Sequence, residues 1–355
     1  MKKKVCFIAA AVLLISTLIA CGSENSEKER ANAGESPTAQ TEDTIKETGD
    51  ESTKTAKDKD QFLIGVASPN NKVPYFSKLV EGMTDLEGEL NVKLDVQDAQ
   101  DDANTQINQI QTFIAEGCDL IIMMPVQMES LIPVAVECNE AGIPIMTVDR
   151  KLSNSDPSEV GVDLITHVGC DDIEGGRKQG ELVHQLIGDT GSIVLIQGTL
   201  GASSQVLRQQ GLEEYLKEEA PGIQIIAAQN SDQDQSKAIT VMQNFLTRFG
   251  EGEIQAIVAQ DPYSALGAVD AIKSASRDEL LGTVIGYDLP SEVLDSIKAK
   301  DMYGSTLQAP YAMGELTLKV AYKCLTEGRD GIEALTYTEM PIVYIDNAND
   351  YEPAW

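Results

Sequence analysis

A carboxylate and a guanidinium stand side by side at Asp149 and Arg150, directly after a short apolar run. Carboxylates accept hydrogen bonds from two neighbouring hydroxyls and arginine donates through a fixed fork, so each such bond contributes about 1.5–3 kcal/mol. Polar residues also follow the other apolar runs: Asn70, Asn71, Asp171, Asp172, Gln197 with Arg208, Asp261, Asp288 and Gln308. Together they favour a ligand covered in hydroxyl groups, and the nearby aromatic pair Tyr75 and Phe76 supplies an apolar face for ring C–H groups.

These side chains need a parallel sheet to bring them together. Between residues 118 and 150 an apolar run stops at Pro125, an amphipathic run follows, and Gly142-Ile143-Pro144 precedes a second apolar run. This order predicts a strand, a helix and a parallel strand, because parallel pairing needs a crossover and crossovers are right-handed. The two strands then end at the same edge of the sheet, where open α/β sheets hold their ligands.

The alternation of strand and helix continues from Gln61 to about residue 345. Besides the strand that ends at Asp149, predicted strands lie at 62–66, 92–96, 120–124, 167–169, 193–197, 223–227, 254–259, 284–288, 302–307 and 342–345. Apolar stripes at helical spacing predict intervening helices, including one long stripe from Phe76 to Leu90 and a last long helix at 311–325. The predicted fold class is α/β, with two doubly wound parallel-sheet lobes.

The amino terminus reads as an export signal of a bacterial lipoprotein. A basic start is followed by an apolar segment at 5–20 that is too short for a comfortable membrane span. Its end, Leu18-Ile19-Ala20-Cys21-Gly22, is similar to a lipobox, whose cysteine is lipidated and becomes the first residue after cleavage. Residues 22–60 contain almost no large apolar side chain and predict a disordered tether. We expect a lipid-anchored protein on the outer face of the cytoplasmic membrane.

Composition and missing motifs exclude several classes of protein. The net charge of -30 leaves no basic surface for nucleic acid. The sequence has no GxGxxG after the first strand, no GxxxxGK[ST] and no HExxH. The two histidines, His167 and His184, read as structural or surface residues. No cofactor and no metal site are indicated, and the acidic run at 232–234 lacks the glycine and glutamate of a calcium loop.

An enzyme is the rival reading. Asp149 and Asp288 could be imagined as the acid/base pair of a glycosidase, but such a pair needs one carboxyl with a raised pKa. We expect Arg150 to lower the pKa of Asp149 instead, which argues against catalysis.

The six cysteines show no CxxC spacing, so neither a zinc site nor a disulfide framework is indicated. We expect Cys118 and Cys138 at the end of the first lobe away from the ligand, as packed free thiols, although a disulfide between them stays open. Cys170 is expected to pack at the hinge.

The ordered motifs of the chain resemble a known family. They are Pro74-Tyr75-Phe76, Gly142-Ile143-Pro144 with Thr147-Val148-Asp149-Arg150, Gly175-Gly176, Gly201-Ala202-Ser203 with Arg208 and Gly211, Val241-Met242-Gln243-Asn244, Ala265-Leu266-Gly267-Ala268, Gly286-Tyr287-Asp288, and Gln308. Their order and spacing are similar to those of the ribose-binding-protein group of type 1 solute-binding proteins, which serve sugar ABC importers. The resemblance covers nearly all of residues 61–345.

The resemblance implies a periplasmic binding protein-like fold of type 1, with two lobes joined by a three-segment hinge and a ligand in the cleft. The first lobe would contain 61–170 and 309–337, and the second 171–308 and 338–355. The implied ligand-binding residues are Tyr75, Phe76, Asn71, Asp149, Arg150, Asp172, Arg208, Gln233, Asp261, Asp288 and Gln308.

Two positions depart from the ribose-binding pattern. Gln233 replaces an aromatic residue and Asp261 replaces an asparagine. The loss of an aromatic wall and the gain of a carboxylate make a polyol, a hexose or an amine-bearing sugar at least as suitable as ribose. We therefore predict a monomeric, non-enzymatic lipoprotein that captures a monosaccharide or polyol and delivers it to an ABC permease and its ATPase. The alternative is a sensor that presents a sugar or an autoinducer-like furanose to a membrane kinase.

Overall fold

The computed structural model of the protein describes residues 61–355. The expected signal peptide, the lipidated Cys21 and the tether of residues 22–60 lie outside these described residues. Within residues 61–355, no helix combines the length and the apolar character needed to cross a membrane.

Strands and helices alternate along the described chain. Their order is β1 (Phe62–Ser68), α1 (Pro74–Thr84), α2 (Glu87–Leu90), β2 (Val92–Asp98), α3 (Ala103–Glu116), β3 (Leu120–Met123), α4 (Ile132–Glu140), β4 (Ile145–Val148), η2 (Pro157–Val160), β5 (Leu164–Gly169), α5 (Asp172–Ile187), β6 (Thr190–Gln197), α6 (Ser203–Glu219), β7 (Gly222–Asn230), α7 (Gln235–Arg248), β8 (Ala256–Ala259), α8 (Pro262–Ser274), η3 (Asp278–Leu280), β9 (Val284–Ile285), α9 (Ser291–Lys298), β10 (Gly304–Thr306), α10 (Pro310–Glu327), β11 (Leu335–Tyr337), β12 (Ile342–Tyr344) and η4 (Ala348–Asp350).

The strands form two sheets, which confirms the predicted pair of doubly wound α/β lobes. The first sheet has the order β11-β5-β4-β3-β1-β2 and the second the order β12-β10-β9-β8-β6-β7. All pairings are parallel except that of β12 with β10, which is antiparallel. In both sheets the strand order reverses beside the first strand of the series, so the carboxyl ends of the central strands border a crevice.

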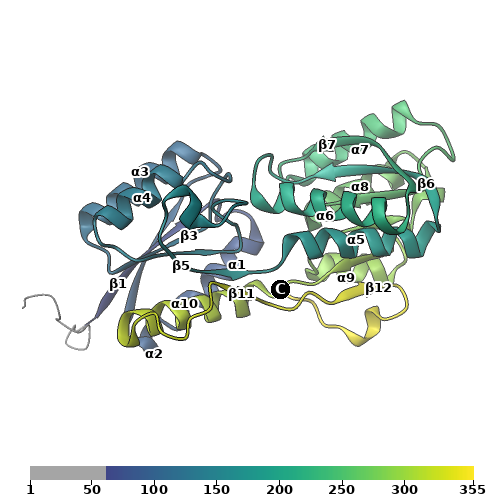
Figure 1. The fold of residues 1–355 in the computed structure, drawn as a ribbon. Coiled ribbons are helices and arrows are strands. Elements are labelled where there is room, and N and C mark those ends of the chain that lie inside the picture. Colours follow the sequence, from purple (N-terminus) through teal and green to yellow (C-terminus); the bar gives the residue numbers. More distant parts are fainter. Residues whose placement is uncertain (1–60) are drawn as a thin grey trace, which may run out of the picture. The chain divides into compact units, whose positions relative to one another are not determined.

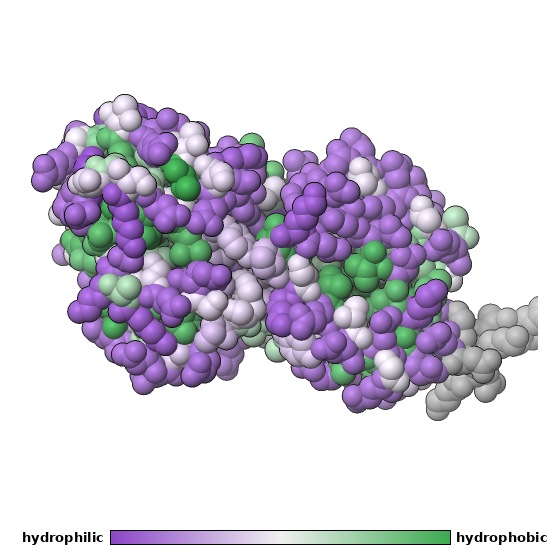
Figure 2. Space-filling view, turned by 180° about the vertical axis from the view of Figure 1, so that it is seen from behind, coloured by the Kyte–Doolittle hydropathy of each residue, from purple (hydrophilic) through white to green (hydrophobic). Residues whose placement is uncertain are grey.

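Helices cover both faces of each sheet, as Figure 1 shows. In the first lobe, α1 and α10 pack on one face, and α3 and α4 on the other. In the second, α7, α8 and α9 pack on one face, and α5 and α6 on the other. Because β3, β4 and β8 are buried along their whole length, these strands are apolar runs without alternation. The outer surface is mostly hydrophilic, and apolar residues form small separate groups on the face in Figure 2.

Reciprocal glycines hold α1 and α10 together. A Cβ on Gly82 of α1 would lie 2.1 Å from the carbonyl oxygen of Tyr311, and a Cβ on Gly314 of α10 would lie 2.0 Å from that of Leu79. Such distances are far inside van der Waals contact, so each glycine admits the backbone of the other helix. This contact fixes α1, which begins with the site residues Tyr75 and Phe76.

The second lobe repeats this device between α5 and α6. A Cβ on Gly176 would lie 2.0 Å from the carbonyl oxygen of Arg208, and a Cβ on Gly211 would lie 1.9 Å from that of Ile173. The close approach of the two helices brings Arg208 of α6 beside Asp172 of α5. The glycine pairs therefore position binding-site residues in both lobes.

Three segments cross between the sheets: β5 to α5, β10 to α10, and β11 to β12. Side chains tie these segments to one another. The thiol of Cys170 lies 3.0 Å from the Thr338 hydroxyl, which agrees with its expected place at the hinge. The ammonium of Lys178 donates to the carbonyl oxygen of Met340 over 2.6 Å, and the Tyr287 hydroxyl lies 3.1 Å from the Met340 sulfur.

Some predicted elements were wrong or missing. The stripe from Phe76 to Leu90 is two helices, because the chain turns after Thr84 and Glu87 accepts a hydrogen bond from the backbone N–H of Leu94 over 2.7 Å. Helix α9 was not predicted, although its buried residues Val293, Leu294 and Ile297 share one helical face; its eight residues make only about two turns, so the stripe is short. Strand β11 was also missed, because a three-residue edge strand with exposed Leu335 and Tyr337 lacks the pattern of a buried strand.

Candidate ligand-binding site between the two sheets

The residues that follow the central strands meet at one small cavity between the sheets. Asp149 follows β4 and Asp288 lies just beyond β9, with φ values of 61° and 66°. Aspartate tolerates this left-handed conformation better than most residues, and at both positions it turns the chain that leaves the strand. The cavity is lined by Val73, Tyr75, Phe76, Asp149, Arg150, Ser204, Arg208, Gln233, Asp261, Pro262, Tyr263 and Asp288.

The cavity has a volume of about 20 Å³, because the lobes are closed on each other. The backbone N–H of Met128 donates to the carbonyl oxygen of Gly201 over 2.9 Å, and that of Lys151 donates to the Ser203 hydroxyl over 2.8 Å. Both bonds join the first lobe to the second. A space of this size holds one water molecule but no sugar ring, so access for a sugar requires these contacts to open.

Tyr75 joins the first lobe to the hinge. Its hydroxyl lies 2.8 Å from a carboxylate oxygen of Asp149 and also contacts the side-chain amide of Gln308. A phenol has a single proton to donate, so Tyr75 donates either to the Asp149 carboxyl or to the side-chain oxygen of Gln308, and not to both at once. Burial, and then the negative charge of Asp149, hold the pKa of Tyr75 well above its usual value, so the phenol stays protonated.

Arg150 is buried, and two of its three nitrogens have no hydrogen-bond partner among the described residues. Its guanidinium donates to the carbonyl oxygens of Val126 and Pro125 over 3.2 and 3.4 Å, and its carbon lies 4.9 Å from the centre of the Phe76 ring. Its Nε and Nη2 have no hydrogen-bond partner among the described residues, although the side chain is only 1% exposed. A buried unpaired donor costs about 1–3 kcal/mol, so these two groups are available to a ligand at little desolvation cost.

Arg208 has most of its hydrogen bonds within the protein. Its Nε donates to Asp172 over 2.8 Å, its Nη1 donates to the carbonyl oxygen of Gln260 over 2.6 Å, and its carbon lies 3.5 Å from the centre of the Tyr287 ring. Asp172 therefore orients Arg208 and is not itself part of the cavity wall. Arg208 reaches the cavity as a fixed, stacked cation.

Two carboxyls of the second lobe, those of Asp261 and Asp288, differ in how far their hydrogen bonds are satisfied within the protein. Asp261 caps α8: one of its oxygens accepts from the backbone N–H of Ser264 over 2.8 Å and the other from the Ser264 hydroxyl. In contrast, the Oδ1 of Asp288 is buried without a hydrogen-bond partner among residues 61–355. Burial raises the pKa of Asp288 to about 8, although Arg208 opposes the rise. Asp288 therefore offers an acceptor that a ligand hydroxyl would satisfy.

The expected pKa of Asp149 was wrong. Arg150 does favour the charged carboxylate, but burial has the larger effect and raises the pKa of Asp149 above its usual value. The sequence argument assumed that the arginine would dominate, whereas the closed cleft removes water from both groups. The pKa of Arg150 is lowered for the same reason. A lowered pKa of Asp149 thus cannot serve as an argument against catalysis.

The predicted site residues fall into three groups. Eight line the cavity: Tyr75, Phe76, Asp149, Arg150, Arg208, Gln233, Asp261 and Asp288. Gln308 and Asp172 lie one contact away, behind Tyr75 and Arg208 respectively. Asn71 is not part of the wall, because its side chain is bonded to the Ser68 hydroxyl over 2.5 Å. Contact of any of these residues with a ligand stays a prediction.

Four wall residues were not predicted: Val73, Ser204, Pro262 and Tyr263. Tyr263 changes the expected chemistry, because it adds an aromatic side chain to the wall of the cavity that Gln233 also lines. The sequence did contain a signal for Tyr263. Asp261-Pro262 is a helix cap followed by proline, which marks the first turn of a helix and places the next residue at the edge of the sheet.

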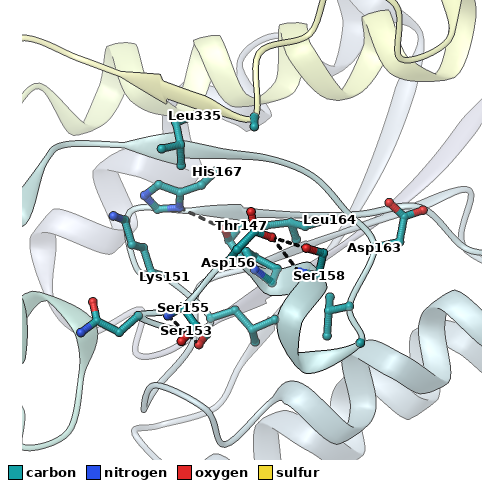
Figure 3. Close-up of a pocket in the computed structure, with 16 residues that line it drawn as sticks. Thr147, Lys151, Ser153, Ser155, Asp156, Ser158, Asp163, Leu164, His167 and Leu335 are labelled. Atoms are coloured by element: carbon teal, nitrogen blue, oxygen red, sulfur yellow. Dashed lines mark hydrogen bonds between the residues drawn. The ribbon is translucent and has the colours of Figure 1, made fainter.

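A larger cavity, of about 610 Å³, lies on the first lobe and is separate from this site. Its wall includes the segment 151–158, residues 161–164 and part of β11, as Figure 3 shows. His167 is buried there with its Nδ1 3.0 Å from the Thr147 hydroxyl, and burial lowers its pKa to about 3. None of the predicted ligand-binding residues lines this cavity.

Cys118 and Cys138 lie away from the candidate site. Cys118 and Cys138 are buried free thiols within the apolar cluster under α3 and α4, as the default expectation had it. Burial raises the pKa of Cys118 to about 11 and that of Cys138 to about 12, so both stay protonated and unreactive.

Comparison with known proteins agrees with this architecture. The periplasmic binding protein domain matches residues 64–330. The chain belongs to this family. The resemblance to solute-binding proteins of sugar importers is thereby confirmed, and the family is one of extracytoplasmic binding proteins.

Individual relatives carry small polyhydroxylated ligands. The xylitol-binding protein of Mycolicibacterium smegmatis is 30% identical over 83% of this chain and 80% of its own length. A solute-binding protein of an ABC transporter from Bacillus halodurans, solved with bound myo-inositol, is 26% identical with a TM-score of 0.75, over 83% of this chain and 98% of that one. The fructose-binding periplasmic domain of a hybrid two-component system is 25% identical with a TM-score of 0.73, over 81% and 92%.

Proposed function

We propose that this protein is a substrate-binding lipoprotein of an ABC importer that captures a monosaccharide or related polyol in the cleft between its lobes. The site is non-enzymatic in this proposal: the ligand is held and released unchanged. Membership of the periplasmic binding protein family supports the proposal. Two relatives also support it, one described as a xylitol-binding protein and one solved with bound myo-inositol.

One observation carries the proposal. The wall of the closed cleft contains two unpaired donors on Arg150, from the first lobe, and one unpaired acceptor on Asp288, from the second. A ligand hydroxyl accepts and donates at once, so a ring or chain with several hydroxyls satisfies both lobes together. Phe76 and Tyr263 add aromatic surface for the C–H groups of such a ligand.

Other residues of the wall favour a neutral or amine-bearing ligand over an acid. Asp149, Asp261 and Asp288 face the cavity, against Arg150 and Arg208. With Asp172 bonded to Arg208, the buried carboxyls outnumber the guanidiniums. Burial already raises the pKa of Asp149, Asp261 and Asp288, so the closed wall disfavours further negative charge. A carboxylate or phosphate on the ligand would add such charge, whereas hydroxyls and an ammonium would not.

The test is a thermal-shift screen of the mature protein against ribose, other pentoses, hexoses, xylitol, myo-inositol and amino sugars. A ligand at ~100 times its Kd adds about 2.7 kcal/mol to the free energy of unfolding and raises Tm visibly. A sugar acid serves as the matched negative control. If no polyol raises Tm while a sugar acid does, the proposed ligand class is wrong.

The proposed setting is the outer face of the cytoplasmic membrane. Lipidation of Cys21 would anchor the chain, the tether of residues 22–60 would give it reach, and a permease with its ATPase would recognise the closed monomer. Mass spectrometry of the membrane fraction tests whether Cys21 carries a lipid. Independently, Cys21→Ala should release the protein from the membrane.

The same lobes could instead present their ligand to a sensor kinase. The specific support for this second function is the likeness to the fructose-binding domain of a hybrid two-component system. Deletion of the chain's own gene separates the two functions. Loss of uptake of the bound sugar indicates import, and unchanged uptake with loss of a sugar-dependent transcriptional response indicates sensing.

A further inference from the structure

The segment that follows η4 is held on the second lobe, beside the binding site, by two backbone hydrogen bonds, which we call the strap. The backbone N–H of Ala354 donates to the carbonyl oxygen of Leu289 over 2.8 Å, and that of Ser291 donates to the carbonyl oxygen of Trp355 over 3.1 Å. Leu289 directly follows the site residue Asp288. These two bonds fix Trp355 to the loop that carries Asp288, whose Oδ1 has no hydrogen-bond partner among the described residues.

The side chain of Trp355 nevertheless packs on the first lobe. Its ring lies 5.6 Å from that of Tyr75, at an angle of 77°, which is an edge-to-face pair. The indole is half-buried among the side chains around the first-lobe core. Trp355 is therefore held by the backbone of one lobe and by an aromatic ring of the other.

A second neighbour of Trp355 lies on the wall of the cavity. The Tyr263 hydroxyl has no aligned hydrogen bond among the described residues, and an interaction with the Trp355 side chain opposes the rise in its pKa that burial causes. Tyr75 and Tyr263 come from α1 and α8, one from each lobe, and both line the cavity. Trp355 touches both without lining the cavity itself.

We propose that Trp355 is a positioning residue of the binding site, which clamps Tyr75 against the second lobe and stabilises the closed arrangement of the lobes. Its ring contact crosses the cleft, so it exists only when the lobes are closed, whereas its strap to Leu289 and Ser291 lies within one lobe and persists on opening. The part of this inference that concerns ligand affinity rests on the proposed function; the ring contact does not.

The contact can be tested by fluorescence, because Trp355 is the only tryptophan of the chain. Emission maximum and acrylamide quenching are measured for the mature protein and for Tyr75→Leu, without ligand and with ribose, xylitol or myo-inositol. Tyr75→Leu should shift the emission to the red and increase quenching. Tyr337→Leu is the matched control, since Tyr337 is an exposed tyrosine on β11, and it should leave both readouts unchanged. If Tyr75→Leu leaves emission and quenching as in the parent under every condition, the proposed contact does not exist.

The effect on binding is tested with two substitutions of Trp355. An aromatic pair contributes enough to weaken the apparent Kd about two- to tenfold when it is lost, so Trp355→Leu should bind the responding sugar by that factor less tightly. Trp355→Phe keeps a ring against Tyr75 and should restore affinity to within about twofold. X-ray scattering of ligand-free Trp355→Leu should show a larger radius of gyration than the parent.

The outcomes separate the clamp by Trp355 from the proposed ligand class. If none of the sugars binds the parent but Tyr75→Leu changes the fluorescence and Trp355→Leu enlarges the protein, the clamp stands and the proposed ligand class falls. Equal affinity of the parent and Trp355→Leu for a sugar that binds, with an unchanged radius of gyration, refutes the clamp.

Discussion

The two arginines of the cleft should respond to substitution in opposite ways. Arg150 has two buried donors without a partner, whereas Arg208 has its Nε and Nη1 bonded to Asp172 and to the backbone of Gln260. We compare Arg150→Met with Arg208→Met, because methionine keeps an unbranched apolar side chain in the same space. The first change should mainly weaken ligand binding, and the second should mainly weaken the fold.

The magnitudes follow from the contacts. In Arg150→Met the ligand loses up to two charge-assisted donors of about 1.5–3 kcal/mol each, so we expect a loss of at least about 2 kcal/mol, or roughly 30-fold in Kd. The fold loses two long bonds to backbone carbonyls but is also relieved of two unpaired donors at about 1–3 kcal/mol each, so the free energy of unfolding should change little.

Arg208→Met leaves Asp172 buried without its partner, and breaking a buried pair in this way costs about 3–5 kcal/mol. At about 2 °C per kcal/mol for a body of this size, Tm should fall by roughly 6–10 °C. The assay is differential scanning fluorimetry without ligand, followed by calorimetric titration with the sugar that raised Tm most in the screen. The reasoning is refuted if Arg150→Met lowers the ligand-free Tm as much as Arg208→Met does, or if it leaves the Kd unchanged.

Three further changes test the fold, the carboxyls and specificity. Gly211→Ala should destabilise the protein by more than the usual cost of overpacking, about 1–3 kcal/mol, because the new Cβ would meet a backbone oxygen at 1.9 Å; urea unfolding measures this. Between about pH 4 and pH 8 the folded protein keeps the proton of Asp288 that the unfolded chain loses, so stability should fall as pH rises, by up to about 1.4 kcal/mol per pH unit, and Asp288→Asn should flatten this slope in urea titrations. Asp261→Asn should keep the cap of α8 and thus the Tm, but shift the ranking of Kd values toward ribose and away from amino sugars.

Each of these has a control or a contrary outcome. Gly88→Ala is the matched glycine change, because a Cβ there meets nothing within 4 Å in an exposed helix, and it should be neutral or stabilising. Stability that rises between pH 5 and pH 8 would contradict the raised pKa of Asp288. An unchanged order of sugars for Asp261→Asn would remove this carboxylate from the determinants of specificity.

The sequence was sufficient for the features that depend on periodicity. Buried parallel strands are continuous apolar runs, so their carboxyl ends could be located, and the residues at those ends include Asp149, Arg150 and Asp288. Sheet order follows from the same logic, because short crossovers leave few topologies open. What was predicted well is therefore what local pattern and chain topology determine.

The features that failed depend on contacts between distant segments. Strand β11 exists because β5 offers a free edge, and nothing within Leu335–Tyr337 marks it as a strand. The pKa of Asp149 depends on how closely the lobes shut and exclude water, which no spacing encodes. Trp355 reaches Tyr75 through a strap of two backbone bonds, so its place beside the site could be found only in three dimensions.

The unpaired groups of the cleft explain why closure should depend on a ligand. When the lobes close without one, Arg150 and Asp288 lose their water and find no protein partner, so the closed form carries a cost that the open form does not. A polyol that bonds to both groups removes this cost only when the lobes are closed, and this difference in affinity shifts the population toward the closed form. The contacts of Lys151 with Ser203 and of Trp355 with Tyr75 act in the same direction without a ligand. The balance between these protein contacts and the unpaired groups then sets how far the ligand-free protein opens, and Trp355→Leu and Arg150→Met should move it in opposite directions.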